Sequence, residues 1–423
     1  MDAVVRPGEV TGSVRAPPSK SISHRALLRA LLAHGRSTIQ NLSRCADVVA
    51  TLEACRTFGA EVGEDPELIT LHGCGPELTV PDGAIDCANS GTTLRFFTVA
   101  GCLAPGAVRL TGDSSLTQRP MEPLLAALRG LGADARRDAD GSVTVRGPLK
   151  PGSTILDASA SSQYLSAMLL VLPVLEGDWR IDLAGPLASR GYVDLTLEAL
   201  DDPSFARIDE GGATINGGIK YPSIERTIEG DWSAAAFPVA AGLLGGEVRV
   251  QGLVKSSRQP DRALLGLIDL LDGEVSWEGD TLIARRSELN GTELDVSDTP
   301  DLFPALLLLA ARARGTTTIT GTARLRYKES DRVSTCTDVL RAMGADIAVG
   351  DDRVVVRGVP SLRGAEVTSH GDHRVAMMAV TAGLGATNAT MIQGMDCLDV
   401  SWPGFLEAVK GLGGLVRTTA PLP

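Results

Sequence analysis

The chain has 423 residues, and at about 150 residues per domain this length indicates two or three domains with room for a large core. Hydrophobic residues make up 43% and charged residues 22% of the chain, which is ordinary globular usage and excludes collagen, coiled coil and long disorder. The net charge of -12 and the 4% aromatic content argue against a nucleic-acid surface, and no apolar stretch is long enough to span a membrane. We therefore expect neither nucleic acid nor membrane as a partner.

The 7 cysteines form no C-x-x-C pair and show no zinc-ligand spacing. Free cysteines of this kind favour a reducing compartment. The beginning, MDAVVRPGEV, lacks the cationic and apolar regions of a signal peptide. We therefore predict a cytoplasmic protein without a metal site.

A strand-like stretch that ends in Asn or Gly recurs along the chain about every 70 residues. These stretches end at Asn41, Gly112, Gly185, Gly252, Gly321 and Gly394. Each is followed by a polar loop and then by a stretch of helical periodicity that usually closes on Gly, as in LLAALRGLGADA at 124–135. Six units of this kind account for the whole chain.

A second recurring element lies between these stretches: an extended segment, a break of small or polar residues, and an apolar helix. The breaks lie at Lys20, Ser90, Ser161, Asp231, Pro300 and Asp372. Their Ser and Asp residues suit helix N-caps, and clustered helix N-termini attract anions. An extended solenoid that only binds a partner is the alternative, but the breaks carry more charged and hydroxyl side chains than capping requires.

The breaks and the loops beside them identify a family. In order and spacing, the chain resembles 5-enolpyruvylshikimate-3-phosphate synthases (3-phosphoshikimate 1-carboxyvinyltransferases) in PPSKSISHRALL, CANSGTTLRFF, SLTQRPMEPLL, ASASSQYLSAML, LRYKESDR and GDHRVAM, over about residues 10–413. The resemblance implies an α/β fold, the two-domain inverse α/β barrel, with six β-α-β-α-β-β repeats, three per domain. It also implies a discontinuous first domain of residues 1–14 plus 228–423, an inserted second domain of residues 15–227, and an active site in the cleft between them.

The resemblance implies an enzyme of the shikimate pathway, which leads to chorismate and the aromatic amino acids. The family transfers the enolpyruvyl group of phosphoenolpyruvate to the 5-hydroxyl of shikimate 3-phosphate, giving 5-enolpyruvylshikimate 3-phosphate and phosphate. It needs no cofactor, and glyphosate inhibits it in competition with phosphoenolpyruvate. The two small-molecule substrates are the implied partners, and we expect a monomer.

The resemblance also assigns site residues. The catalytic set is Asp301, Glu329 and Lys20. The shikimate 3-phosphate set is Lys20, Ser21, Arg25, Ser161, Ser162, Gln163, Ser189, Asp301 and Lys328. The phosphoenolpyruvate set is Lys20, Asn89, Gly91, Arg119, Gln163, Arg332, His373 and Arg374. Which of the three catalytic groups acts as acid and which as base stays open.

The residue types suit these roles. Both substrates carry a carboxylate and a phosphate, which the planar fork of arginine binds bidentately, whereas Lys20 supplies a mobile point charge. Gly91 lets a ligand approach the backbone closely. For the serines, helix capping is the alternative, and for Tyr192 the alternatives are packing against the shikimate ring or in the core. His370 and His373 resemble a metal pair, but no further ligand set accompanies them.

Two positions depart from the family pattern. Arg324 stands where many members have Asn, and Val400 stands where a Lys is common. A catalytically impaired paralogue that binds shikimate-like anions is therefore one alternative. UDP-N-acetylglucosamine enolpyruvyl transferase is another, but its Lys-Asn pair is Lys20-Ser21 here, and the loop DSSLTQRP lacks its Cys.

Overall fold

The computed structural model describes residues 1–419, which divide into two compact units. Unit 1 consists of Met1–Pro17 and Glu229–Pro423, and unit 2 consists of Pro18–Ile228. The chain thus leaves unit 1 once, builds unit 2 and returns. Each unit has its own hydrophobic core.

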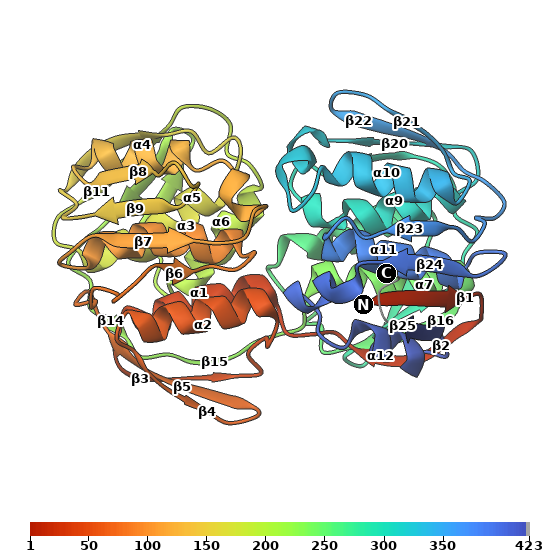
Figure 1. Cartoon of the computed structure of the whole chain (residues 1–423), viewed down its shortest axis with the longest axis horizontal. Helices are drawn as coiled ribbons and strands as arrows, with labels where there is room; N and C mark the ends of the chain where they lie inside the picture. The colour runs from red at the N-terminus through yellow and green to blue at the C-terminus, as the bar shows by residue number, and fades with distance from the viewer. Residues whose placement is uncertain (420–423) are drawn as a thin grey trace. The chain divides into compact units, whose positions relative to one another are not determined.

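Three sheets form the outside of unit 2 (Figure 1). The first contains β14 (Tyr221–Pro222) and β15 (Glu225–Thr227), both beside β3 (Ala33–Gln40), then β5 (Leu68–Cys74) and β4 (Glu61–Glu64). The second has the order β6 (Ile85–Asp86), β7 (Val108–Thr111), β9 (Val143–Arg146), β8 (Asp134–Arg137). The third has the order β10 (Gly152–Leu156), β11 (Trp179–Leu183), β13 (Gly212–Ile215), β12 (Ala206–Asp209).

Three buried helices fill unit 2. They are α1 (Lys20–Leu31), α3 (Gly91–Ala100) and α5 (Gln163–Val171), and they contact one another. Nearly every residue of these helices is buried, as the continuous apolar runs after each break predict. The other three helices are α2 (Ala46–Thr57), α4 (Glu122–Gly130) and α6 (Arg190–Ala199), which alternate buried and exposed residues.

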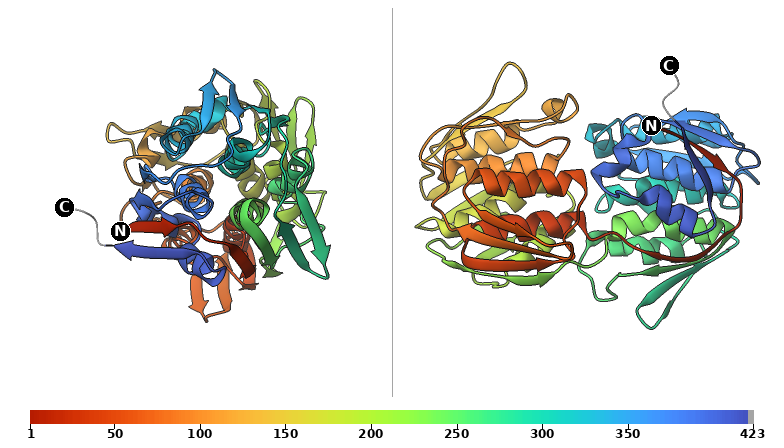
Figure 2. Two further views of the ribbon diagram at one scale, coloured as in Figure 1. Left: turned by 90° about the vertical axis from the view of Figure 1, so that its right-hand side faces the viewer. Right: turned by 60° about the horizontal axis from the view of Figure 1, so that its bottom comes forward.

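Unit 1 repeats this plan. Its sheets have the orders β2 (Val10–Arg15), β16 (Gly246–Gln251), β18 (Thr281–Arg285), β17 (Glu274–Glu278); β19 (Glu293–Asp295), β20 (Thr316–Thr320), β22 (Arg353–Arg357), β21 (Asp346–Val349); and β23 (Glu366–Thr368), β24 (Thr390–Gln393), β1 (Asp2–Arg6), β25 (Leu415–Thr419). The buried helices are α7 (Trp232–Gly245), α9 (Phe303–Arg312) and α11 (His373–Leu384), which lie side by side in Figures 1 and 2. The outer helices are α8 (Leu264–Asp269), α10 (Arg332–Ala342) and α12 (Phe405–Gly411).

The six predicted strand-like stretches are the central strands β3, β7, β11, β16, β20 and β24, one in each sheet. In four sheets the central strand pairs in parallel with the strand that precedes its buried helix in the chain. In the other two sheets the partners are exchanged: β3 pairs in parallel with β15 and β14, and β16 pairs in parallel with β2. The six-fold repeat is therefore confirmed. In three sheets, strands that are distant in the sequence pair with each other: β1 pairs with β24 and β25, β2 pairs with β16, and β15 pairs with β3.

The structure confirms most of the predicted helix ends and corrects one helix end and one helix start. Gly59, Gly132, Gly344 and Gly413 take positive φ just past helices α2, α4, α10 and α12. After α8, however, Asp272 takes this conformation at φ 60, and Gly273 does not. At the start of α5, Ser162 is the N-cap by position but makes no side-chain cap hydrogen bond, so capping does not account for its hydroxyl.

Candidate active site

Lys20 is the first residue of α1 in unit 2. Ser19 caps this helix by accepting a hydrogen bond from the Ile22 amide, at 3.4 Å. The Lys20 ammonium donates to Oδ2 of Asp47 on α2 at 2.8 Å, and the side chains are only 16% and 6% exposed. The sequence motif therefore places a cation at a helix N-terminus, where an anionic ligand gains from both charge and dipole.

The start of α3 carries a second group of predicted residues. Ser90 caps the helix by accepting from the Thr93 amide at 3.1 Å. Asn89, just before the cap, donates to Oδ2 of Asp113 at 2.6 Å and accepts from Nη2 of Arg119 at 3.1 Å. These bonds bring Asn89 and Arg119 together, although they lie on different loops.

Gly91 lies between two arginine side chains. An added Cβ would sit 2.9 Å from Nη1 of Arg95 and 3.0 Å from Nη1 of Arg119, which is closer than real Cβ contacts. The absence of a side chain at Gly91 therefore lets two guanidinium groups approach the first turn of α3. This arrangement concentrates positive charge beside free helix N–H groups.

Gln163, the first residue of α5, joins this group. Its Oε1 accepts from Nη1 of Arg95, and its Nε2 donates to Oγ1 of Thr92 at 2.9 Å. Arg95 and Thr92 were not among the predicted site residues. A single arginine four residues after Gly91, on an otherwise apolar helix, was the available signal for Arg95.

The predicted shikimate-side serines lie at three helix starts in unit 2, with Ser21 as the second residue of α1. Ser161 accepts from the Gln163 amide at 3.3 Å, and Ser162 is 5% exposed. Ser189 precedes α6 in the left-handed conformation, at φ 45, and is also buried. A non-glycine residue at positive φ is uncommon and marks a local constraint on this loop.

Arg25 is held by protein groups on three sides. It donates to Thr196 Oγ1 at 2.8 Å, to the Ser21 carbonyl at 2.9 Å and to the Tyr192 carbonyl at 2.9 Å. Burial lowers the pKa of Arg25 to about 10. Arg25 therefore fastens α1 to α6, and Tyr192 packs partly buried against the core.

Arg332, at the start of α10, is the centre of the site residues in unit 1. It has no exposed surface, and it donates to Oδ1 of Asp301 at 2.8 Å, to Oε2 of Glu329 at 2.5 Å and to Oδ2 of Asp372 at 2.9 Å. Asp372 also caps α11, because it accepts from the Arg374 amide at 2.9 Å. One guanidinium thus brings both predicted proton-transfer carboxylates together.

Asp301 is surrounded by cations. Besides Arg332, Arg374 Nη2 lies 3.2 Å from its Oδ2 and Lys328 Nζ lies 3.5 Å from its Oδ1. Burial alone would raise the pKa of Asp301, but the charges of Arg374, Lys328 and Arg332 outweigh burial and hold the pKa below its usual range. For Lys328, burial prevails and lowers the pKa. Asp301 is consequently an ionised carboxylate at neutral pH.

His373 and Asp261 are two further buried groups among the site residues of unit 1. His373 is the first residue of α11 and is 1% exposed. Asp261, which no motif predicted, lies in the 3-10 turn Pro260–Ala263, is also 1% exposed and accepts a hydrogen bond from Ser233. Burial, followed by the negative charge of Asp301, raises the pKa of Asp261 to about 7.

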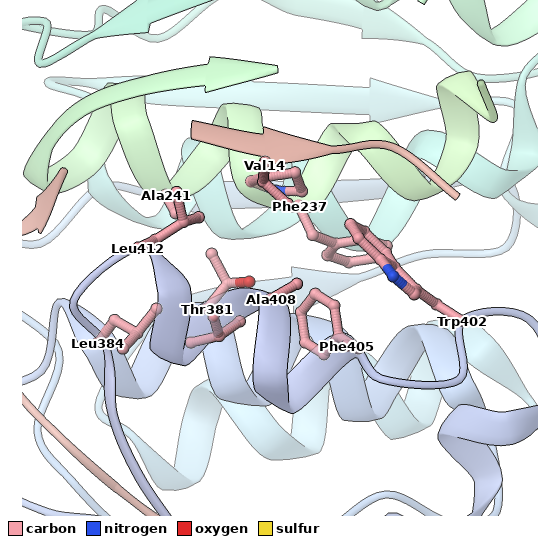
Figure 3. A pocket seen from close by; sticks show the side chains of 11 residues that line it. Val14, Phe237, Ala241, Thr381, Leu384, Trp402, Phe405, Ala408 and Leu412 are labelled. Carbon is pink, nitrogen blue, oxygen red and sulfur yellow. The ribbon is translucent and has the colours of Figure 1, made fainter. Parts of the chain in front are cut away.

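The two departures from the family pattern both lie in unit 1. Arg324, in the turn Ala323–Tyr327, donates to the Ser297 carbonyl in the loop before Asp301. Val400 ends the turn Met395–Val400 and is half-buried. Trp402, two residues later, packs edge-on against Phe405 and lines an apolar cavity (Figure 3). No charged side chain of the described residues lines this cavity, and the Thr381 hydroxyl donates to the Met377 carbonyl, so the cavity does not suit an anionic substrate.

Within residues 1–419, no three His, Cys, Asp or Glu side chains are grouped to hold a metal ion. No helix in the same residues combines the length and the apolarity needed to cross a membrane.

Comparison with solved structures defines the class of protein. The enolpyruvyl transferase NikO from Streptomyces tendae shares the fold, with a TM-score of 0.80 at 22% identity over 99% of each chain. An EPSP synthase from Acinetobacter baumannii has a TM-score of 0.82 at 27% identity, over 99% of this chain and 100% of that one. The predicted fold, an inverse α/β barrel with two domains, is confirmed.

Sequence comparison then gives the family. Residues 4–409 match EPSP synthase (3-phosphoshikimate 1-carboxyvinyltransferase). The 3-phosphoshikimate 1-carboxyvinyltransferases of Methanocorpusculum labreanum and Halobacterium salinarum are 38% and 41% identical, over 99% and 98% of this chain and 100% and 99% of theirs. The chain belongs to the EPSP synthase family, so the predicted transferase of aromatic amino-acid biosynthesis is confirmed, and neither alternative is supported.

Proposed function

We propose that this chain transfers the enolpyruvyl group of phosphoenolpyruvate to the 5-hydroxyl of shikimate 3-phosphate, using the site residues of both units. Beyond family membership, the observation that carries the proposal is the buried cluster in which Arg332 holds Asp301 and Glu329 together at 2.8 and 2.5 Å. A surface ion pair needs no such burial, whereas a site for two polyanions needs fixed cations beside groups that move protons.

Phosphoenolpyruvate binds, in this proposal, at the start of α3 in unit 2 and at the cations of unit 1. The contributing residues are Lys20, Asn89, Gly91, Arg119, Gln163, Arg332, His373 and Arg374. The support is the convergence of Asn89, Gly91 and Arg119, to which Arg95 now adds a further guanidinium. The planar guanidinium of Arg119 suits a bidentate contact with a carboxylate or phosphate.

Shikimate 3-phosphate binds at Lys20, Ser21, Arg25, Ser161, Ser162, Gln163, Ser189, Asp301 and Lys328. The hydroxyls of Ser161 and Ser162 lie at the start of α5, where they join the helix N–H groups in donating to phosphate. Arg25 acts mainly by charge and by holding α6, because its nitrogens already donate to Ser21, Tyr192 and Thr196.

The reaction needs a base for the 5-hydroxyl and an acid for the methylene carbon of phosphoenolpyruvate. The hydroxyl oxygen bonds to C2 as C3 takes a proton, and the resulting ketal loses that methyl proton and phosphate. The surrounding cations hold the pKa of Asp301 low and make it a weak base. Bound anions offset those cations and raise the pKa of Asp301 toward the working pH, where acid–base catalysis is most effective. Lys20 supplies charge to the transferring phosphate.

We further propose that the second domain is inserted into the first and that the two units close around the substrates, which places the active site in the cleft between them. Each unit holds only part of the predicted residues, and two chain crossings give a natural hinge. The radius of gyration from X-ray scattering should fall when shikimate 3-phosphate is added. All seven cysteines are free, which suits the reducing cytoplasm where we propose that a monomer works.

A phosphate-release assay tests the function. Phosphate should appear only when shikimate 3-phosphate and phosphoenolpyruvate are both present, and mass spectrometry should find the enolpyruvyl product. Replacing shikimate 3-phosphate by UDP-N-acetylglucosamine should give no phosphate. Binding of shikimate 3-phosphate without any turnover would instead indicate an impaired paralogue.

A further inference from the structure

A chain of buried hydroxyl groups connects α1, α2 and α3 of unit 2. Nδ1 of His24 lies 2.6 Å from Oγ1 of Thr51, which lies 2.6 Å from Oγ1 of Thr93. The Thr93 hydroxyl in turn donates to Oγ of Ser90 at 2.6 Å. None of the four side chains is more than 1% exposed. Water therefore cannot replace these hydrogen bonds without a rearrangement of the core.

Thr93 Oγ1 is the donor toward Ser90 Oγ, and both Thr51 and Thr93 can also donate to the Asp47 carbonyl. In the Thr51–Thr93 pair either hydroxyl can donate, and the His24 tautomer sets whether Nδ1 donates or accepts. Burial, followed by the charges of Lys20 and Arg25, holds the pKa of His24 well below its usual value, so the ring is neutral. Nε2 has no hydrogen-bond partner among the described residues, so the bond of Nδ1 to Thr51 alone orients the ring.

The hydroxyl chain passes between two predicted substrate-binding groups. Asp47 accepts from the Lys20 ammonium through Oδ2 at 2.8 Å, while its backbone oxygen lies 3.4 Å from Oγ1 of both Thr51 and Thr93. At the other end, Ser90 caps α3 directly before Gly91. Thr93 thus touches both the residue that holds Lys20 and the residue that fixes the first turn of α3.

We propose that Thr93 is a positioning residue for phosphoenolpyruvate: its hydroxyl fixes the start of α3, at Gly91, relative to Asp47 and Lys20. The inference rests on the proposed function, because it assumes that Lys20 and Gly91 bind this substrate. Hydrogen bonds in a dry interior are strong and are costly to leave unmade, so the hydroxyl holds the two groups in one geometry. A displacement of either group weakens the grip on a small, highly charged ligand.

Thr93→Val tests the proposal, because valine keeps the shape and removes the hydroxyl. Thr98→Val is the matched control: Thr98 is fully buried on the same helix, but its hydroxyl donates only to the Leu94 carbonyl of α3 at 2.6 Å. We expect Thr93→Val to raise the KM for phosphoenolpyruvate about tenfold, as for the loss of one buried hydrogen bond. The KM for shikimate 3-phosphate should change less than about twofold, and Thr93→Ser should restore the parent value.

Thr51→Val breaks the same chain from α2 and carries no predicted substrate contact. It should raise the same KM, and the double variant should add little, because both changes remove one connected network. If Thr93→Val does not fold, Thr51→Val takes its place in the comparison. Equal phosphoenolpyruvate constants in Thr93→Val and Thr98→Val, or an equal rise in both substrate constants, would overturn the proposal. An inactive parent protein would instead contradict the proposed function.

Discussion

The guanidinium of Arg332 donates to Oδ1 of Asp301 at 2.8 Å from a position with no exposed surface. Because Arg374 and Lys328 lie within 3.5 Å of the same carboxylate, Asp301 pairs with three cations. Charge that is already balanced by protein groups is available to an anionic substrate only if the carboxylate changes partner or takes a proton. This pairing therefore links substrate binding to proton transfer.

Asp301→Asn and Glu329→Gln should separate turnover from binding. Each change removes a proton-transfer group, which is worth about 10²–10⁴-fold in kcat. Binding of shikimate 3-phosphate should stay equal or become tighter in Asp301→Asn, because the loss of one negative charge leaves more positive charge for the ligand. Steady-state kinetics and titration calorimetry give the two quantities.

Asp338→Asn is the control for both carboxylate variants. Asp338 lies on α10, as Arg332 does, but it is 63% exposed and pairs only with the surface residue Arg341 at 3.7 Å. Its removal should leave kcat unchanged. A kcat near the parent value in Asp301→Asn or Glu329→Gln would show that the corresponding carboxylate does not transfer a proton.

Asp261→Asn should change how stability depends on pH. The folded pKa of Asp261 is about 7, against about 3.9 in an unfolded chain. Since the folded pKa is raised, the folded state keeps a proton that the unfolded state has lost, and this stabilisation disappears as pH rises from about 4 through 7. Asparagine cannot ionise, so the Tm of the variant should fall less than that of the parent between pH 5 and 8.

Circular dichroism melts at several pH values measure this difference, again with Asp338→Asn as the control. Asp301 has the opposite sign: its depressed pKa contributes stability above about pH 4 that is lost on acidification. The difference between the parent and the Asp261→Asn variant from pH 5 to 8 therefore reports on Asp261. Parallel Tm curves for the parent and Asp261→Asn would show that Asp261 is ionised throughout the window.

Much of this architecture could be predicted from the sequence because it depends on local patterns. The periodicity of apolar residues and the Gly after each helix define the helices, and the spacing of about 70 residues defines the repeats. The breaks at Lys20 and Ser90 follow from the same patterns, since each lies at the start of a buried helix, whereas the roles of Lys20 and Gly91 follow from the family resemblance. Two local details were not predicted: the left-handed residue after α8 is Asp272 instead of Gly273, and Ser162 makes no side-chain cap hydrogen bond.

Features that depend on distant segments were not predictable from spacing. β1 pairs with β24 and β25, nearly the whole chain away, and no local pattern gives that register. The negative charge of Asp301 contributes to the raised pKa of Asp261, although 40 residues of sequence separate the two and no motif joins them. In the sequence, Arg95 is only an isolated charge in an apolar helix. The fold brings Gln163 and Gly91 beside it.

Gly91→Ala should weaken the binding of both phosphoenolpyruvate and glyphosate. The new methyl would lie 2.9 and 3.0 Å from the guanidinium nitrogens of Arg95 and Arg119, so both side chains must shift. We expect the inhibition constant of glyphosate to rise at least tenfold and the KM for phosphoenolpyruvate to rise less. A tenfold rise lies within the cost of overpacking, which is about 1–3 kcal/mol.

Gly83→Ala provides the matched control, because no atom lies within 4 Å of a Cβ added there and its backbone needs no positive φ. Its constants should equal those of the parent. Equal inhibition of Gly91→Ala and Gly83→Ala by glyphosate would place the inhibitor away from the start of α3.

Val400→Lys should improve the use of phosphoenolpyruvate. The resemblance places a lysine at this position near the phosphate, and a lost charge-assisted hydrogen bond is worth about 1.5–3 kcal/mol, or roughly ten- to a hundredfold in affinity. Two candidate cations are engaged by other groups: Lys410 pairs with Glu407 at 2.7 Å on α12, and Arg324 donates to the Ser297 carbonyl. We therefore expect the parent to have a high KM for phosphoenolpyruvate and a near-normal one for shikimate 3-phosphate.

The backbone beside residue 400 is firmly held, which makes the substitution informative. Trp402 is 5% exposed and its ring centroid lies 5.1 Å from that of Phe405, so a new lysine starts from a fixed position. Val349→Lys is the control, because this substitution adds the same charge at a surface position, on β21 of the same unit. The KM for phosphoenolpyruvate should fall at least about tenfold in Val400→Lys and stay constant in Val349→Lys. A lysine at 400 that leaves this constant unchanged, or raises it, would mean that the loop of residues 395–402 binds the phosphate differently from its relatives.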